Sequence, residues 1–254
     1  MLFPIGDDNR GLHRTAYVTI TLLVGNLVVY FFLQGSAAFT YGFAAVPLEL
    51  TTGVDLVSPE TLRVQGQSIE IPHAPGPTPI WLTAITAMFM HGGLGHLAGN
   101  MLYLWIFGDN VENRFGHRAF LAFYLVSGLA ATAAQVALKP SSVIPTLGAS
   151  GAIAGVLGAY LVLFPRNKVH FLFFLWVISV PALVAIGFWI VTQFVSGWGS
   201  ITAATEQAGG VAYAAHIGGF VAGVVLATIM RVFIKKERQN VFEVTVHKRG
   251  DRMW

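Results

Sequence analysis

Residues 91–100 read HGGLGHLAGN and open an apolar segment that ends near Glu112. His96 and Asn100 are four residues apart, so in a helix they lie on one face. The two glycines that follow His91 are expected to interrupt the helix, and we interpret His91 as a structural residue that orders the preceding loop. Polar side chains at the start of such a segment are costly in a membrane and indicate a functional site.

Two further polar residues open apolar segments later in the chain. Ser150 lies in the sequence GASG at residues 148–151, and His216 lies in the sequence AHIGG at residues 215–219. The polar residues therefore occupy equivalent positions in three separate segments.

The whole chain has the composition of a membrane protein. Of its 254 residues 55% are hydrophobic and 11% are charged, whereas soluble domains carry about 25% charged residues. The hydropathy pattern predicts an all-α integral membrane protein of six spanning helices, residues 1–254 forming one domain with a long first extracytoplasmic loop from about 35 to 80. The spans are expected at about residues 16–33, 96–107, 120–138, 150–164, 171–194 and 212–234.

The basic residues predict the orientation of these spans. Of the 15 Lys and Arg residues, only Arg63 and Lys139 fall on one side of the membrane, and the others flank the opposite ends of the spans. The positive-inside rule then places the N-terminal stretch 1–15 and the basic tail 235–254 in the cytoplasm. We interpret the net charge of +3 as this topology signal, and no nucleic-acid partner is predicted. The chain has no Cys, which excludes thiol and disulfide chemistry.

Counting residues to the first cytoplasmic Arg places the polar groups at one depth. At about 1.5 Å per residue, the counts correspond to heights of roughly 21–27 Å in a hydrocarbon core about 30 Å thick. We expect the groups to converge a little below the outer surface. The counts are 18 residues from His96 to Arg114, 14 from Asn100 to Arg114, 16 from Ser150 to Arg166 and 15 from His216 to Arg231.

A serine and a histidine at one depth suggest a nucleophile and its base. The Ser150 hydroxyl is inert at neutral pH until a neighbour takes its proton, and the neutral imidazole of His216 suits that role. Ser150 lies at a helix start, where unpaired backbone N–H groups can stabilise an oxyanion. His96 and Asn100 can donate further hydrogen bonds to the same oxyanion.

Glycine pairs spaced four residues apart predict that the fourth and sixth spans pack closely. Such small-residue faces let helix backbones approach each other. Because the first glycine of the sixth span comes three residues after His216, the contact would also bring this histidine within hydrogen-bond distance of Ser150. The pairs are Gly151 and Gly155 in the fourth span, and Gly219 and Gly223 in the sixth.

With these motifs the chain resembles the rhomboid family of intramembrane serine proteases, in its bacterial-type six-span form, over essentially its whole length. Each motif is short, but their combination and order are specific. The residues that carry the resemblance are 91–100, Leu104, Phe107, Gly108, Val111, Glu112, Gly116, 148–151, His216, Gly219 and Gly223.

The resemblance implies a Ser–His dyad without an acidic third member. It assigns Ser150 as the nucleophile, His216 as the base, and His96 and Asn100 as oxyanion donors together with the Ser150 backbone N–H. It implies a serine endopeptidase that cleaves transmembrane segments of single-span membrane proteins near the outer face, with no metal and no other cofactor. Gly148 is expected to be structural, as are the glycine pairs and His91.

The fifth span is linked to substrate entry in this family, which makes its aromatic residues gate candidates. Some members carry an aromatic residue four positions after the serine, packed against the base, whereas this chain has Ala154. The packing partner of His216 is therefore expected to come from elsewhere. Whether the long loop or the fifth helix moves stays open. The gate candidates are Phe188, Trp189, Phe194 and Trp198.

Two non-enzyme alternatives stay open. A transporter would also carry intramembrane histidines, but here the polar groups gather at one end and no inverted repeat is evident. A catalytically inactive rhomboid relative would bind membrane helices without cutting them. In either case we expect a multi-pass protein of the plasma or inner cell membrane, in contact with the lipid bilayer. The oligomeric state stays open.

Overall fold

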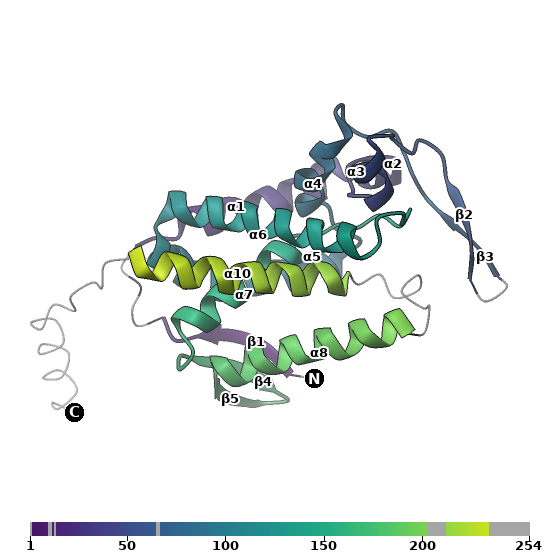
Figure 1. The fold of residues 1–254 in the computed structure, drawn as a ribbon. Coiled ribbons are helices and arrows are strands. Elements are labelled where there is room, and N and C mark those ends of the chain that lie inside the picture. Colours follow the sequence, from purple (N-terminus) through teal and green to yellow (C-terminus); the bar gives the residue numbers. More distant parts are fainter. Residues whose placement is uncertain (1, 10–11, 13, 65–66, 203–211, 234–254) are drawn as a thin grey trace, which may run out of the picture.

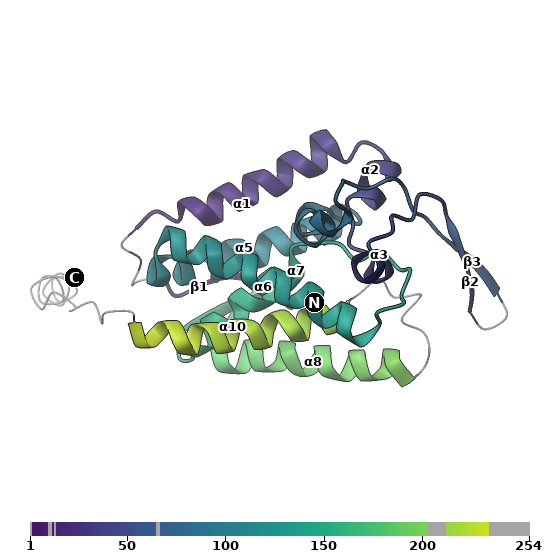
Figure 2. The same cartoon turned by 45° about the horizontal axis from the view of Figure 1, so that its top comes forward.

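The described residues form a bundle of long helices flanked by two small β-sheets. The computed structural model of the chain describes residues 2–9, 12, 14–64, 67–202 and 212–233. The helices run side by side, with α1 and α8 on opposite sides of the bundle (Figures 1 and 2). They are α1 (Tyr17–Val28) with its π-helical extension η1 (Val29–Leu33), α5 (Leu94–Phe115), α6 (His117–Leu138), α7 (Ser150–Leu163), α8 (Ala182–Thr202) and α10 (Tyr213–Phe233).

Five of the six apolar segments predicted from the sequence fold as helices at the expected places. By length and composition, α6 and α10 of the described part are able to cross a membrane, and shorter apolar helices include Ser150–Leu163 and Ala182–Gly197. The number of spans therefore stays a prediction. The basic tail 235–254 lies outside the described residues.

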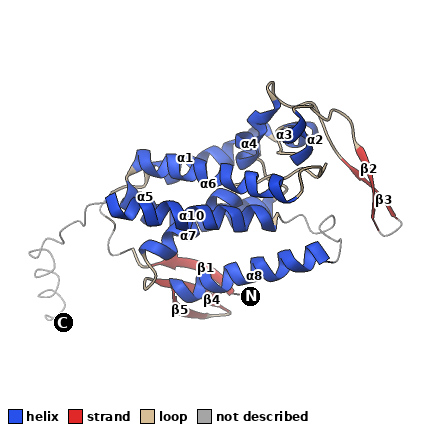
Figure 3. Cartoon of the chain, in the orientation of Figure 1, coloured by secondary structure: helices blue, strands red, loops and turns tan. Residues whose placement is uncertain are grey.

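The segment predicted as the fifth span, residues 171–194, begins as a strand pair. Strands β4 (Lys168–Phe173) and β5 (Trp176–Pro181) pair antiparallel, and α8 starts only at Ala182. Strand β1 (Leu2–Asp7) pairs with the other edge of β4, which gives the order β1-β4-β5 beside α8 (Figure 3). The all-α prediction is therefore wrong here. Residues 168–181 are rich in β-branched and aromatic side chains, which favour strands, and Pro181 marks the boundary before the helix.

The long loop between α1 and α5 is folded. An antiparallel bridge joins Ala45 to Thr146 through backbone hydrogen bonds of 2.9 and 2.8 Å. The loop is thereby tied to the segment that leads into Ser150. Its elements are α2 (Ala37–Gly42), α3 (Pro47–Thr52), the hairpin of β2 (Glu60–Val64) and β3 (Gln67–Ile71), the 3-10 turn η2 (Ile80–Leu82), α4 (Thr83–Thr86) and the 3-10 turn η3 (Ala87–Phe89).

Glu112 joins α5 to the start of α1. Its carboxylate is fully buried and accepts hydrogen bonds from the backbone N–H groups of Val18 and Thr19 at 2.8 and 2.7 Å. The first N–H groups of a helix lack intrahelical partners, and α1 has no side-chain cap of its own. Glu112 therefore supplies that cap from another helix, at the end of the bundle where α10 also finishes (Figure 1).

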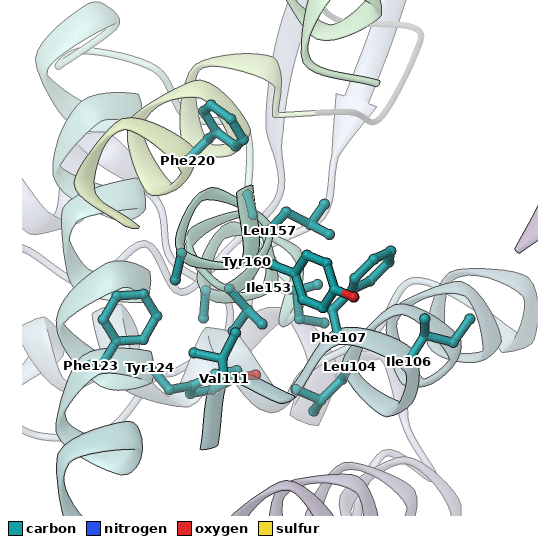
Figure 4. Packing of buried hydrophobic residues seen from close by; sticks show 14 of the residues in the cluster. Leu104, Ile106, Phe107, Val111, Phe123, Tyr124, Ile153, Leu157, Tyr160 and Phe220 are labelled. Carbon is teal, nitrogen blue, oxygen red and sulfur yellow. The ribbon is translucent and has the colours of Figure 1, made fainter. Parts of the chain in front are cut away.

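Helix α7 is the centre of the bundle. Every residue from Gly151 to Tyr160 is buried, as expected for a helix that is apolar on all sides. Ile153, Leu157 and Tyr160 lie in the middle of the apolar cluster, among side chains of α5, α6 and α10 (Figure 4). The ring of Tyr160 meets Phe107 edge-on at a centroid distance of 5.0 Å. This surrounding fixes the position of Ser150 at the first residue of the helix.

Helices α7 and α10 touch through their backbones. A Cβ atom on Gly219 would clash with the carbonyl oxygen of Gly151, and one on Gly223 would clash with the backbone of Gly155. The close approach occurs at the glycines that the sequence singles out. Gly158 extends it by a further turn, because a Cβ there would strike the backbone of α10.

We expect Gly223→Ala to force α7 and α10 apart, because the new Cβ would meet backbone atoms that cannot rotate away. Overpacking of this kind costs about 1–3 kcal/mol, so the thermal midpoint in detergent should fall. Gly187→Ala is the matched control, since a Cβ at this position of α8 has no atom within 4 Å. If both Gly223→Ala and Gly187→Ala had the thermal midpoint of the wild type in differential scanning, the backbone contact would be contradicted.

Asp7, the last residue of β1, ties the N-terminal segment to α7. Its Oδ2 accepts hydrogen bonds from the Tyr160 hydroxyl and, at 2.8 Å, from Asn110 Nδ2. Burial raises the pKa of the Asp7 carboxyl from 3.8 to about 7; the Tyr160 hydrogen bond opposes this, and repulsion from Asp109 and Asp8 adds to it. The protonated carboxyl is therefore favoured in the folded protein.

The contribution of Asp7 to the stability of the fold should be lost as the pH rises from about 4 to about 7. The raised folded pKa means that the folded chain holds this proton where the unfolded chain has lost it. In Asp7→Asn this contribution is absent, so we expect the thermal midpoint of the variant to rise relative to that of the wild type as the pH increases over this range. Glu60→Gln removes an exposed carboxyl on β2 and should keep the wild-type slope. Equal slopes for the wild type and Asp7→Asn would refute the assignment.

Candidate active site

Ser150 and His216 meet at the start of two packed helices. Ser150 is the first residue of α7, and His216 lies in the first turn of α10. His216 Nε2 is 2.8 Å from Ser150 Oγ, which is a good hydrogen-bond distance. The backbone contact of Gly219 with Gly151 follows within one turn of both residues. Helix packing therefore sets the distance between the two side chains.

Gln193 of α8 contacts the other nitrogen of the same imidazole. Its Oε1 is 2.8 Å from His216 Nδ1. Its Nε2 donates to Thr192 Oγ1 at 3.5 Å, and that hydroxyl donates to the Trp189 carbonyl at 2.6 Å, which leaves the amide oxygen facing the imidazole. With the Nδ1–H donated to this oxygen, Nε2 carries no proton and can accept the one on Ser150. This is the tautomer that a general base needs.

Gln193 is not among the site residues predicted from the sequence. Its signal is a polar side chain inside an apolar helix, four residues after Trp189 and on the same face. Trp189 packs against the imidazole of His216, with ring centroids 6.1 Å apart and planes tilted by 33°. The partner expected in place of an aromatic residue at Ala154 thus comes from α8. Trp189, predicted as a gate residue, lies against the ring of His216.

His96 and Asn100 of α5 face the turn before Ser150. The backbone of Gly148 has φ +119°, a conformation that glycine adopts easily. A Cβ there would lie 2.8 Å from His96 Nε2 and 3.5 Å from Asn100 Nδ2. Asn100 Nδ2 is buried and has no hydrogen-bond acceptor among the described residues. A donor in this position is suited to an oxyanion that forms only during a reaction.

The tautomer of His96 follows from its contact with Gly92. The Gly92 N–H donates to His96 Nδ1 at 3.4 Å, so a neutral ring carries its proton on Nε2, the ring nitrogen that faces Gly148. The buried ring of His91 packs against His96 with centroids 5.2 Å apart. The backbone of His91 exchanges two hydrogen bonds of 3.0 Å with the side-chain amide of Gln34. His91 thereby joins the end of η1 to the start of α5.

Two other gate candidates, Phe188 and Phe194, have exposed side chains on α8. Phe188 is 72% exposed. Phe194 lines an apolar groove of about 730 Å³ together with residues of α6 and α10. Trp198 falls within α8, and its side chain is outside the described part.

The chain belongs to the rhomboid family: the family model described as Rhomboid domain matches residues 79–233, more than half of the chain. Rhomboid protein 1, mitochondrial, of Saccharomyces cerevisiae is 33% identical over 163 residues, which are 63% of this chain and 44% of that protein. Rhomboid protease GluP of Bacillus subtilis is 36% identical over 147 residues, 56% of this chain and 27% of that protein. Presenilin-associated rhomboid-like protein, mitochondrial, of Bos taurus is 29% identical over 164 residues, which are 63% of this chain and 41% of that protein.

The chain spans less than half of the length of each of these relatives. Membership of the family makes it a helical, membrane-integral protein. The names of the relatives include mitochondrial proteins, so the expected location in a plasma or inner cell membrane stays a prediction. The matched region contains all five polar residues of the site: His96, Asn100, Ser150, Gln193 and His216.

The contact of Gln193 with His216 predicts that the amide controls the reactivity of Ser150. In Gln193→Leu the Nδ1–H loses its acceptor and the imidazole can take the wrong tautomer, so labelling of Ser150 by a fluorophosphonate should slow by about 10–100-fold. Gln193→Glu keeps an acceptor oxygen and should label faster than Gln193→Leu. Equal labelling rates for the wild type and Gln193→Leu, both folded, would remove Gln193 from the site.

Proposed function

We propose that this chain is a serine endopeptidase that cuts membrane-anchored proteins within the bilayer. The proposal depends on one observation, the continuous relay from Ser150 through His216 to Gln193 with 2.8 Å at each step. A serine hydroxyl bonded to an imidazole of fixed tautomer is the arrangement of an activated nucleophile. The similarity to a relative named as a protease supports the same class of reaction.

The first half of the reaction would form an acyl-enzyme. His216 Nε2 takes the proton of the Ser150 hydroxyl as Oγ attacks the carbonyl carbon of the scissile peptide bond. The negative charge moves to the carbonyl oxygen, where the Ser150 N–H, His96 Nε2–H and Asn100 Nδ2–H donate hydrogen bonds. The C–N bond then breaks, and the imidazolium gives its proton to the leaving amine.

The second half would release the acyl group. A water molecule gives a proton to His216 Nε2 and attacks the ester carbon, and the same donors stabilise the second oxyanion. The imidazolium then returns its proton to Ser150 Oγ. Gln193 Oε1 accepts the Nδ1–H throughout, which stabilises the positive ring without a buried carboxylate. His96 lies at the exposed edge of the site, where water can enter.

We further propose six spans with both termini in the cytoplasm. The helix positions and the bias of basic residues support this arrangement. It places the first residues of α5, α7 and α10, and with them the site, toward the outer face of a plasma or inner cell membrane. The substrates would be single-span membrane proteins whose helices enter near α8.

A comparison of the wild type with Ser150→Ala and His216→Ala in detergent tests the proposal. We expect the wild type to label with a fluorophosphonate and to cleave a model single-span substrate, and both variants to lose both activities. We also expect Asn100→Ala to cleave about 100-fold more slowly while keeping its fold, because one oxyanion donor is worth about that much.

The possible outcomes separate the alternatives. A folded wild type that neither labels nor cleaves, yet binds a transmembrane helix, would favour the inactive relative over the protease. Cleavage that persists in Ser150→Ala would show that the nucleophile is a different residue. If Asn100→Ala cleaved the substrate at the wild-type rate, only the Asn100 donor would be removed from the mechanism.

A further inference from the structure

The tip of the β4–β5 hairpin carries large apolar side chains in a tight turn. Phe173 pairs with Trp176, which leaves Phe174 and Leu175 as a two-residue turn. Phe174 has φ +52°, in the region that turns usually fill with Gly or Asn. Phe174, Leu175 and Trp176 are 73%, 94% and 76% exposed. Residues so poorly matched to a turn in water indicate contact with an apolar medium.

Apolar side chains cover both faces of this hairpin. Successive residues of a strand point to opposite faces, yet Leu172 and Phe173 are both exposed in β4, and Val177 and Ile178 are both exposed in β5. A protein docked on the hairpin would cover one face and leave the other in water. Lipid chains would surround both faces. The pattern therefore favours lipid over a protein partner.

Charge and backbone chemistry restrict the depth of the hairpin. Arg166 and Lys168 are exposed at its base. The outer edge of β5 pairs with no other strand among the described residues, and free N–H and C=O groups cannot be satisfied in hydrocarbon. Aromatic side chains and unpaired backbone groups are both accommodated at the level of the lipid headgroups. The hairpin continues into α8 at Ala182 and lies beside its first turns (Figure 3).

We propose that the β4–β5 hairpin is a lipid anchor in the cytoplasmic leaflet of the membrane. The hairpin backbone lies at the level of the headgroups, and the side chains of Phe174, Leu175 and Trp176 reach the acyl chains. Arg166 and Lys168 bind anionic phospholipid headgroups. The anchor fixes the level at which α8 begins. The inference depends on the proposed orientation of the chain and is independent of proteolysis.

The absence of Cys from the chain allows a single fluorescent label at any chosen position. We would attach an environment-sensitive dye to Leu175→Cys, and to Ser68→Cys on the exposed β2–β3 hairpin as the control. Both proteins would be placed in lipid nanodiscs, where each face of the bilayer meets water. We expect the label at position 175 to emit at shorter wavelength, to be quenched several-fold more by nitroxide-bearing acyl chains, and to be shielded from iodide.

Two results would overturn the anchor. A label at position 175 that iodide quenches as strongly as the label at position 68 would place the tip in water. The label could instead be shielded from iodide, insensitive to nitroxide lipids and exposed on dilution with unlabelled chain. That result would mean that a second copy covers the hairpin. Both labels lie at exposed positions, so the fold should not be disturbed.

The headgroup contact is tested by changing the lipid. Nanodiscs of phosphatidylcholine would be compared with nanodiscs that also contain phosphatidylglycerol. We expect the anionic lipid to increase nitroxide quenching at position 175, and the double variant Arg166→Gln, Lys168→Gln to abolish that increase. An increase that persists in the double variant would refute the role of the two basic residues.

Discussion

The geometry of the site depends on the backbone contact between α7 and α10. Glycines on both helices remove the side chains that would hold the two backbones apart, so the carbonyl oxygen of Gly151 lies directly against Gly219. Ser150 and His216 lie within one turn of this contact, and their side chains meet at 2.8 Å. The distance is therefore set by main-chain packing, which varies less than the rotamers of long side chains. The burial of α7 at the centre of the bundle also fixes the position of Ser150.

Helix α8 belongs to the site in a different way. Much of its surface is exposed, and it contacts the imidazole through Trp189 and Gln193. The two residues lie on one face, so a displacement of α8 would remove the packing ring and the Nδ1–H acceptor together. An opening at this helix would thus also leave the base without its fixed tautomer. The start of α8 at the hairpin then matters for the chemistry as well as for the fold.

The sequence allows prediction of what periodicity and spacing encode. Long apolar runs located five helices, and counting residues to the basic flanks placed Ser150 and His216 at one level before any contact was known. The strand pair at 168–181 was not predicted, because a continuous apolar run is compatible with either a strand or a buried helix. The contact of Gln193 with His216 was not predicted, because it depends on the rotation of α8 relative to α10. The spacing of residues along one helix does not determine which residues of another helix they contact.

The use of an amide at position 193 is consistent with the environment of the base. In a serine protease of water-exposed type, a carboxylate orients the histidine and stabilises its positive charge. A carboxylate buried near the bilayer would cost several kcal/mol of desolvation unless fully paired. An amide oxygen accepts the same Nδ1–H and orients the same ring while it remains neutral. In the proposed mechanism it would stabilise the imidazolium less, so the donors at Asn100 and His96 would carry more of the charge stabilisation. That division of roles would account for the buried Asn100 amide, which has no hydrogen-bond acceptor among the described residues.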